Sequence, residues 1–160
     1  MSHDVRRRAR RKAPSTAPLT RAYTSRQAAQ VSGVPFFTID YWGRTKTLVP
    51  SVAQGQGRGK GRQRMYSYGD LIRLRIAREL REQHVSLETL RSVIHKLADV
   101  TDGLAEAAFV VVGSEVEMAR NATELSNILR RPGRHVFGVI LDLRELLKTV
   151  RERAASLEHV

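Results

Sequence analysis

The chain has 160 residues, of which 41% are hydrophobic, and it carries a formal net charge of +12 at pH 7. This composition is sufficient to bury an apolar core, so at least part of the chain is expected to fold. The absence of cysteine excludes disulfides, thiolate metal sites and cysteine nucleophiles, and the five histidines lack the spacing of metal ligands, so we expect no metal and no other cofactor.

The positive charge is concentrated in the N-terminal half. Residues 1–70 contain 14 Lys and Arg against 3 Asp and Glu, whereas residues 71–160 contain 14 against 13. A basic segment gains affinity for a polyanion by displacing counterions from phosphates. A membrane surface is also anionic, but the basic run at residues 6–12 has no apolar face, and no apolar run is long enough to span a bilayer. Nucleic acid is therefore the expected partner, in the cytoplasm and associated with the nucleoid.

The first segment, residues 1–21, is expected to be a disordered tail. It is rich in Arg, Ala, Pro, Ser and Thr and contains almost nothing to bury. The tail is either a solvated run of charge or a flexible arm that adds phosphate or minor-groove contacts. The composition does not decide between these two interpretations.

Two short helices are expected after the tail. Thr24 or Ser25 can cap a helix that ends at Gly33. A second helix is expected to begin near Pro35 and to end near Thr45, because proline is tolerated in a first turn and large apolar residues recur at helical spacing. Such a pair predicts a helix-turn-helix, whose second helix can lie in the major groove of DNA.

A basic hairpin is expected next. Residues 48–52 and 64–66 are typical of short strands. Residues 53–63 between them interleave glycine with Arg and Lys, which indicates a long mobile tip. A hairpin in this position would form the wing of a winged helix-turn-helix.

Two longer helices are expected to complete the N-terminal domain. Ser67, followed by Asp70, predicts the start of a helix that continues to about residue 83. Ser86, followed by Thr89, predicts the start of another, which continues to about residue 98 with one apolar face. The first domain is expected to end there.

The remaining residues, 99–160, are expected to form a small α+β module. Its pattern predicts strands at 109–112, 115–118 and 135–141, a helix at 123–129, and a final helix from Leu143 through Val150. This module could bind a small-molecule effector or could pair two copies of the chain across a two-fold axis. Dimerisation is the favoured interpretation.

Several segments, taken in order, resemble one known family. They are Tyr23-Thr24-Ser25-Arg26-Gln27-Ala28-Ala29, Gly33-Val34, Thr38-Ile39-Asp40-Tyr41-Trp42, Leu48-Val49-Pro50, Arg64-Met65-Tyr66-Ser67-Tyr68-Gly69-Asp70-Leu71 and Val85-Ser86-Leu87-Glu88-Thr89-Leu90-Arg91. This combination over residues 23–98 resembles the MerR family of winged helix-turn-helix regulators. The likeness is closest to the actinobacterial MerR-like regulators, which carry a compact C-terminal module.

The resemblance implies a homodimer that binds near-palindromic promoter DNA, often with distortion of the duplex. The expected fold class is α+β, divided into a basic tail (1–21), a MerR-like winged helix-turn-helix (22–98) and a small α/β module (99–160). Typical members have Arg in place of Asp40, Glu in place of Gly43, and one residue fewer around Lys46. A metal effector is not expected, because metal-sensing members carry Cys ligands and a long dimerising helix.

The candidate DNA contacts are cationic and hydroxyl side chains on the two short helices and the hairpin, with more contacts to phosphates than to bases. Ile39 and Trp42 are assigned to packing. Asp40 would either accept a hydrogen bond from a cytosine amino group or pair with a nearby Arg. At Tyr66 the resemblance implies an aromatic that supports the base of the wing near DNA, and we expect it both to pack and to contact a phosphate. The candidates are Arg26, Thr38, Tyr41, Arg44, Thr45, Lys46, Arg58, Lys60, Arg62, Arg64 and Tyr66.

The leading hypothesis is a homodimeric, sequence-specific transcription regulator that also contacts RNA polymerase. No enzymatic activity is expected, because His84, His95 and His135 have no carboxylate or Ser partners at a suitable spacing. One alternative is an architectural or excisionase-like protein that bends DNA. Another is an antitoxin-like protein whose C-terminal half binds a protein partner.

Overall fold

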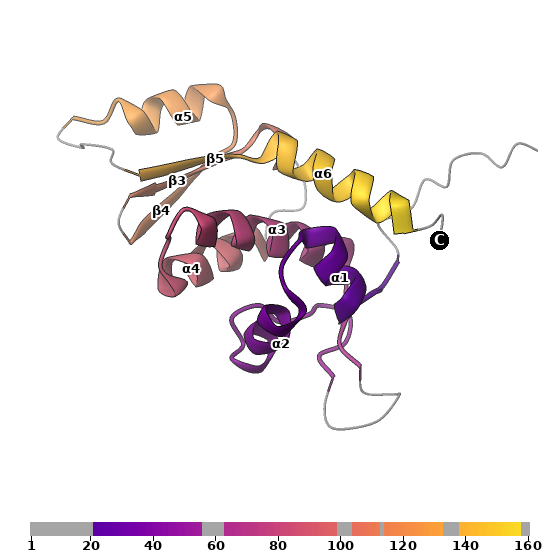
Figure 1. Cartoon of the computed structure of the whole chain (residues 1–160). Coiled ribbons are helices and arrows are strands. Elements are labelled where there is room, and N and C mark those ends of the chain that lie inside the picture. The colour runs from indigo at the N-terminus through magenta and orange to yellow at the C-terminus, as the bar shows by residue number, and fades with distance from the viewer. Residues whose placement is uncertain (1–20, 56–62, 99–103, 113, 133–137, 158–160) are drawn as a thin grey trace, which may run out of the picture.

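A computed structural model describes residues 21–55, 63–98, 104–112, 114–132 and 138–157. Helices α1 and α2 lie at one end of the molecule, α3 and α4 in the middle, and a sheet with α5 on its outer face at the other end (Figure 1). The last helix, α6, runs back from the sheet along α3 and α1. Because helices are combined with two small antiparallel sheets, the fold is mixed α+β. In chain order the elements are β1 (Tyr23–Thr24), α1 (Ser25–Ser32), α2 (Phe36–Arg44), β2 (Met65–Tyr66), α3 (Tyr68–Glu82), α4 (Leu87–Ala98), the short 3-10 helix η2 (Leu104–Glu106), β3 (Ala108–Val112), β4 (Glu115–Ala119), α5 (Ala122–Leu129), β5 (Gly138–Asp142) and α6 (Leu143–Ser156).

The helix-turn-helix forms where the sequence predicts it. Thr24 caps α1, because its hydroxyl accepts a hydrogen bond from Gln27 N at 3.3 Å while Gln27 Oε1 accepts one from Thr24 N at 3.0 Å. Gly33 ends α1 with a φ of +74°, a left-handed conformation that costs glycine little. Pro35 then precedes α2 as its N-cap. The prediction of two short helices is confirmed, and Thr24 rather than Ser25 is the cap.

The base of the wing is built differently from the prediction. β2 pairs in antiparallel fashion with β1, so that Tyr66 lies opposite Tyr23 and Met65 opposite Thr24. On its other side β2 makes an isolated bridge to Ala53, with N to O distances of 2.8 and 3.1 Å between Met65 and Ala53. β2 is therefore paired on one side by the strand that precedes α1, and on the hairpin side by a single bridge to Ala53 in place of the expected strand.

The prediction of a strand at residues 48–52 was wrong. Pro50 has no amide hydrogen to donate to a ladder, and Ser51 N donates instead to Asp70 Oδ2 at 2.8 Å. The segment is held by this side chain and by the burial of Leu48, not by strand pairing. The expected mobile tip falls mainly on residues 56–62, which lie outside the described residues.

The two longer helices begin at the predicted caps. Ser67 Oγ accepts a hydrogen bond from Asp70 N at 3.2 Å, and Asp70 Oδ2 accepts one from Ser67 N at 2.8 Å, which completes a capping box at the start of α3. Ser86 Oγ accepts a hydrogen bond from Thr89 N at 3.2 Å at the start of α4. Both predicted helices are confirmed.

The C-terminal residues form a three-stranded antiparallel sheet in the order β4-β3-β5. The predicted order of two strands, a helix, a third strand and a final helix is confirmed. The third strand begins at Gly138 in the structure, and the part predicted at residues 135–137 lies outside the described residues.

The apolar core is continuous along the chain. Phe109 on β3 belongs to the same buried cluster as Tyr23 near the start of the described chain and Ala154 near its end. The other face of β3 contributes Val110 to a smaller cluster beneath α5. The expected division at residue 98 therefore separates two segments that share one core.

Two arginines hold the end of α1. Arg153 Nη1 on α6 donates to Val31 O, and Arg75 Nη1 on α3 donates to Ser32 O, each at 3.5 Å. The last carbonyls of a helix have no partner within that helix, so these arginines supply donors that α1 lacks. The turn between α1 and α2 is thereby tied to both α3 and α6.

Candidate nucleic-acid interface

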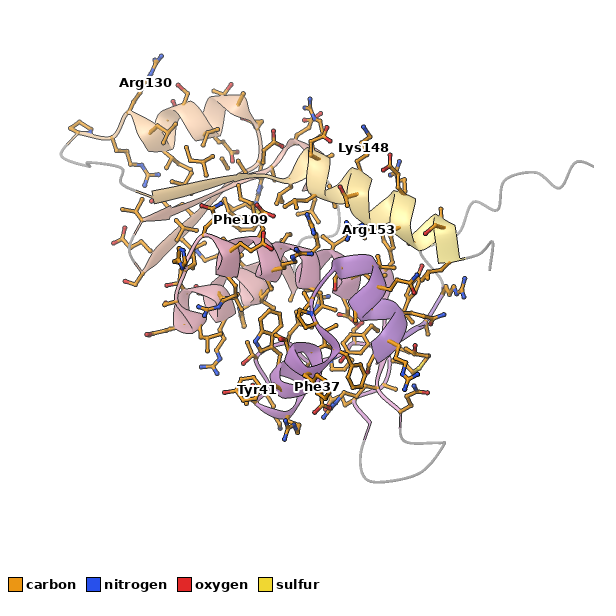
Figure 2. All side chains as sticks on the ribbon, viewed as in Figure 1. Phe37, Tyr41, Phe109, Arg130, Lys148 and Arg153 are labelled. Carbon is orange, nitrogen blue, oxygen red and sulfur yellow. The ribbon has the colours of Figure 1, made fainter. Side chains whose placement is uncertain are left out.

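One face of α2 is turned to solvent and carries large side chains. Phe37, Tyr41 and Arg44 follow one another at intervals of four and three residues, which places them on the same face of a helix. Phe37 is 83% exposed and Tyr41 is 49% exposed, and the Arg44 side chain is 65% exposed. Figure 2 shows Phe37 and Tyr41 on the side of α2 that points away from the body of the protein. We call these three residues the recognition face.

The opposite face of α2 is buried. Ile39 is 1% exposed and Trp42 is 4% exposed, and both belong to the main core. Their assignment to packing is therefore confirmed. Burial of these two side chains fixes the rotation of α2 about its axis and so determines which residues point outward.

Asp40 lies beside the recognition face and pairs with two arginines. Its carboxylate is 3.0 Å from Arg44 Nε in the same helix and 2.5 Å from Arg64 Nη1 at the base of the wing. Of the two alternatives for Asp40, the internal ion pair is the one present in the structure. The pairing connects α2 to the wing and compensates part of the positive charge at the interface.

Gly43 allows Arg64 to reach Asp40. A Cβ atom at Gly43 would lie 3.0 Å from Arg64 Nε and 3.2 Å from Arg64 Cζ, closer than ordinary van der Waals contact. Asp40 and Gly43 are two of the positions at which the chain departs from the pattern it resembles. The structure explains them together, because the carboxylate and the missing side chain both accommodate Arg64.

The turn that follows α2 accommodates the additional residue around Lys46, which is the third departure from the pattern. Lys46 has a φ of +55°, so the chain makes a left-handed turn there, and Thr47 N and Leu48 N both donate to Trp42 O, at 2.9 and 3.3 Å. Thr45 Oγ1 is 2.9 Å from Thr47 Oγ1 and donates to Tyr41 O at 3.0 Å. Thr45 and Lys46 are both exposed, but the Thr45 hydroxyl is already engaged within the protein.

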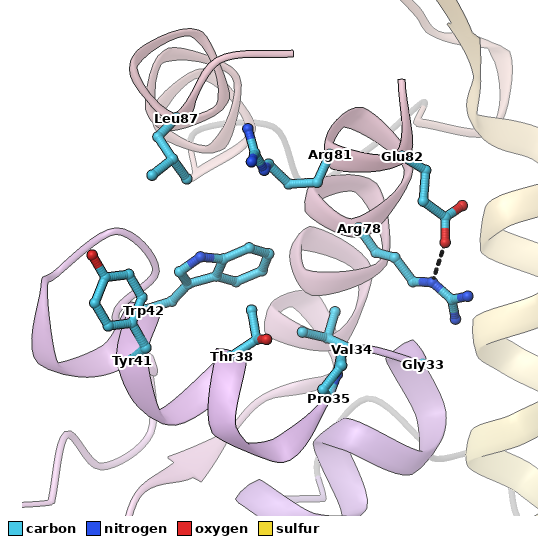
Figure 3. Close-up of a pocket in the computed structure, with 10 residues that line it drawn as sticks. All are labelled: Gly33, Val34, Pro35, Thr38, Tyr41, Trp42, Arg78, Arg81, Glu82 and Leu87. Carbon is cyan, nitrogen blue, oxygen red and sulfur yellow. Dashed lines mark hydrogen bonds and ion pairs between the residues drawn. The ribbon is translucent and has the colours of Figure 1, made fainter. Parts of the chain in front are cut away.

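Thr38 lies outside the recognition face and lines a pocket that Tyr41 of the recognition face also lines. The pocket has a volume of about 560 Å³ and lies between α2, the C-terminal end of α3 and the start of α4. Figure 3 shows the indole of Trp42 reaching from α2 toward α3 beneath Arg81, with Thr38 beside Val34. Thr38 is only half-buried, so its hydroxyl lies at the edge of the candidate interface.

The predicted DNA contact of Tyr66 needs a correction. The side chain has no exposed surface and packs in the main core beneath the wing. Burial raises the pKa of its hydroxyl above the usual value, and the neighbouring Ser25 side chain and the charge of Arg64 oppose that shift. A direct phosphate contact by Tyr66 is excluded in this conformation because the hydroxyl is covered, and the residue supports the wing only through packing.

The other candidates are cationic. Arg26 is exposed in the first turn of α1. Arg64 is engaged with Asp40 and its side chain is only 20% exposed. Arg58, Lys60 and Arg62 lie outside the described residues, as does nearly all of the basic tail. The structure thus brings Tyr41, Arg44 and Arg64 to one end of the molecule and does not place the tip of the wing.

Sequence reasoning missed Phe37 as a candidate contact. Apolar residues on a short helix usually belong to the core, and every predicted DNA contact is a cationic or hydroxyl-bearing side chain. The signal that was available is the helical spacing itself. With Ile39 and Trp42 facing inward, a residue at position 37 must face outward.

The described part of the chain carries neither a metal-binding cluster nor a membrane-spanning helix. Its His, Asp and Glu side chains form no group of three or more that could hold a metal ion. No helix within the described ranges has the length and hydropathy needed to cross a membrane.

Comparison with known proteins agrees with this geometry. The profile of a family described as "MerR HTH family regulatory protein" matches residues 23–97, which contain the helix-turn-helix, the base of the wing and α3 and α4. Uncharacterized HTH-type transcriptional regulators of Mycobacterium bovis and Mycobacterium tuberculosis are 31% identical to the chain over 133 residues. That alignment covers 81% of this chain but 58% of each relative, so the chain spans little more than half the length of the relatives it matches.

Proposed function

Because the chain belongs to the MerR family, whose helix-turn-helix domain occupies residues 23–97, we propose that it is a DNA-binding transcription regulator. In this proposal α2 enters the major groove with the recognition face toward the bases, and the wing contacts the neighbouring backbone. The observation that carries the proposal is the outward face of α2, where Tyr41 and Arg44 stand beside Arg64 at the root of a basic wing. We propose no enzymatic role.

We further propose that the regulator acts as a homodimer on near-palindromic sites. Two copies related by a two-fold axis would present two recognition faces to two half-sites. The C-terminal sheet supports this arrangement, because β5 pairs with β3 on one side only and no described strand pairs with its other edge. Contact with RNA polymerase and association with the nucleoid belong to the same proposal.

The proposal is tested by selecting bound duplexes from a random-sequence library with the full chain. The selected duplex and a scrambled duplex are then compared at two salt concentrations. We expect enrichment of an inverted repeat and a preference over scrambled DNA that persists at the higher salt concentration. Absence of enrichment, with binding that disappears uniformly as salt rises, would instead indicate an architectural or partner-binding protein.

The wing should contribute mainly phosphate contacts. Replacing Arg58, Lys60 and Arg62 together by alanine is expected to weaken binding to the selected and scrambled duplexes alike. The slope of log K against log salt should become shallower by about 0.9 for each phosphate that the variant no longer neutralises. Affinity is measured by fluorescence anisotropy across a salt series.

The control for the wing removes the same charge elsewhere. Arg120, Arg130 and Lys148 are exposed on the C-terminal half, and Figure 2 shows Arg130 and Lys148 far from the recognition face. Their joint replacement by alanine should leave the salt slope nearly unchanged. An equal change of the slope in both triple variants would mean that overall charge, and not the wing, drives binding.

Asp40 should weaken DNA binding in the natural protein. Asp40→Asn removes a negative charge from the interface and frees Arg44 and Arg64, so we expect tighter binding and a steeper salt dependence. Because the ion pairs are partly exposed, the free energy of unfolding should fall by less than about 1 kcal/mol. The same anisotropy series measures binding, and urea unfolding measures stability. Weaker binding by a variant of unchanged stability would show instead that the Asp40 carboxylate itself contacts DNA.

A further inference from the structure

Phe37 is the most exposed large apolar side chain of the described chain. It lies at the N-terminal end of the recognition face, on the side of α2 opposite the buried Ile39 and Trp42. A single exposed apolar residue is ordinary on a protein surface, but Phe37 lies next to a second exposed aromatic ring. Phe36, which is 42% exposed, packs edge to face against it with a ring-centroid distance of 5.8 Å. The two rings form an apolar projection on an otherwise cationic and polar surface.

Resting on the proposed function, we propose that Phe37 reads thymine by packing against its 5-methyl group in the major groove. The thymine methyl is the one apolar group that the base pairs display there. A phenyl ring has no hydrogen-bonding atom, so it can distinguish thymine from the other bases only through this group. Base selectivity at this position therefore depends on apolar contact and not on hydrogen bonds.

The surroundings of Phe37 favour this role over insertion between bases. Apolar wedges that unstack base steps generally enter from the minor groove, whereas a recognition helix lies in the major groove. Phe36 restrains the Phe37 ring through the edge-to-face contact, which reduces the entropy lost when the ring is ordered on a base. Tyr41 and Arg44 follow Phe37 on the same face, one and two turns further along α2, and can fix the helix by contacts to phosphates.

The experiment uses the duplex selected as described above. Each thymine is replaced in turn by deoxyuridine, which removes only the methyl group. For the natural chain we expect at least one position at which this replacement weakens binding about three- to tenfold, the effect of one buried methyl group. Phe37→Ala should bind the thymine duplex more weakly and should no longer distinguish thymine from deoxyuridine at that position.

A matched control truncates another exposed apolar side chain that lies away from the interface. Leu129→Ala shortens another exposed apolar side chain, on α5, and should leave the ratio of thymine to deoxyuridine affinity unchanged. Circular dichroism checks that Phe37→Ala is folded, as expected for a residue outside the core.

The outcomes separate this proposal from the one on which it rests. If no duplex is enriched, the proposed function fails, and thymine reading fails with it. If a duplex is enriched but deoxyuridine has no effect at any position, or if Phe37→Ala still distinguishes thymine from deoxyuridine as the natural chain does, thymine reading by Phe37 is overturned while the regulator remains. In that case the exposed ring would be available to a protein partner.

Discussion

Asp70→Ala is expected to lower the free energy of unfolding by about 3–5 kcal/mol, because three donors lose the buried acceptor that they share, at about 1–3 kcal/mol each. The Asp70 side chain is fully buried. Its Oδ2 accepts hydrogen bonds from Ser51 N at 2.8 Å, Ser51 Oγ at 2.7 Å and Ser67 N at 2.8 Å, and its Oδ1 lies 3.3 Å from Arg73 Nη1. Alanine would leave these donors without their acceptor. Urea unfolding followed by circular dichroism measures the loss.

Asp142 supplies the matched control for Asp70. It also caps a helix, since its carboxylate accepts a hydrogen bond from Arg144 N at 2.9 Å at the start of α6, but it is exposed and, among the described residues, its carboxylate bonds only to this first turn. Asp142→Ala should cost about 1 kcal/mol, the usual value of an N-cap. Equal losses in the two variants would show that Asp70 acts only as a cap and does not hold the segment that leads to the wing.

Phe109→Ala should destabilise the helix-turn-helix although it lies in the C-terminal sheet. Phe109 is completely buried in the core that also contains Trp42, and removing a buried phenyl ring costs about 3–5 kcal/mol. The chain contains a single tryptophan, so its fluorescence reports on α2 alone. We expect the unfolding transitions seen by Trp42 fluorescence and by circular dichroism to move together to lower denaturant concentration.

A second variant tests whether this coupling is specific to the shared core. Ile128 is buried in the smaller cluster beneath α5, apart from the main core. Ile128→Ala should therefore shift the Trp42 transition less than Phe109→Ala does. A Trp42 transition that is insensitive to Phe109→Ala would mean that the two halves unfold independently.

Elements marked by local chemistry could be predicted from sequence. Thr24, Gly33, Ser67 and Ser86 each act within a few residues of their own position, through a side-chain cap or a left-handed backbone conformation, so the boundaries of α1, α3 and α4 followed from them. The spacing of buried residues likewise identified the inner face of α2.

Features that depend on distant partners could not be predicted in this way. The backbone N–H of Ser51 donates to the carboxylate of Asp70, nineteen residues later in the chain, and no local pattern predicts such a contact. A strand was therefore predicted around Ser51 in error. The choice between two roles for Asp40 needed the position of Arg64, twenty-four residues later in the chain. The burial of Tyr66 follows from its pairing with Tyr23 across a strand too short to recognise from its sequence.

The candidate site shows the same limit. Cations and hydroxyls were identified by residue type, which says what a side chain can bind but not whether it is free to bind it. Arg64 and Thr45 prove to be engaged within the protein, and Thr38 faces a pocket. Phe37 was missed for the complementary reason, because its exposure is a property of the helix orientation and not of the residue.

The contact of α6 with α1 has a consequence for the order in which the protein can fold during synthesis. The helix-turn-helix is made first, but its core includes Val150 and Ala154 of α6, and Arg153 of α6 donates a hydrogen bond to Val31 O near the end of α1. Translation proceeds at about 5–20 residues per second, so residues 99–154 follow residue 98 with a delay of roughly 3–11 s. During that interval the apolar surface of α1 and α3 that α6 later covers stays accessible. The helix-turn-helix therefore reaches its final packing only after α6 has been synthesised.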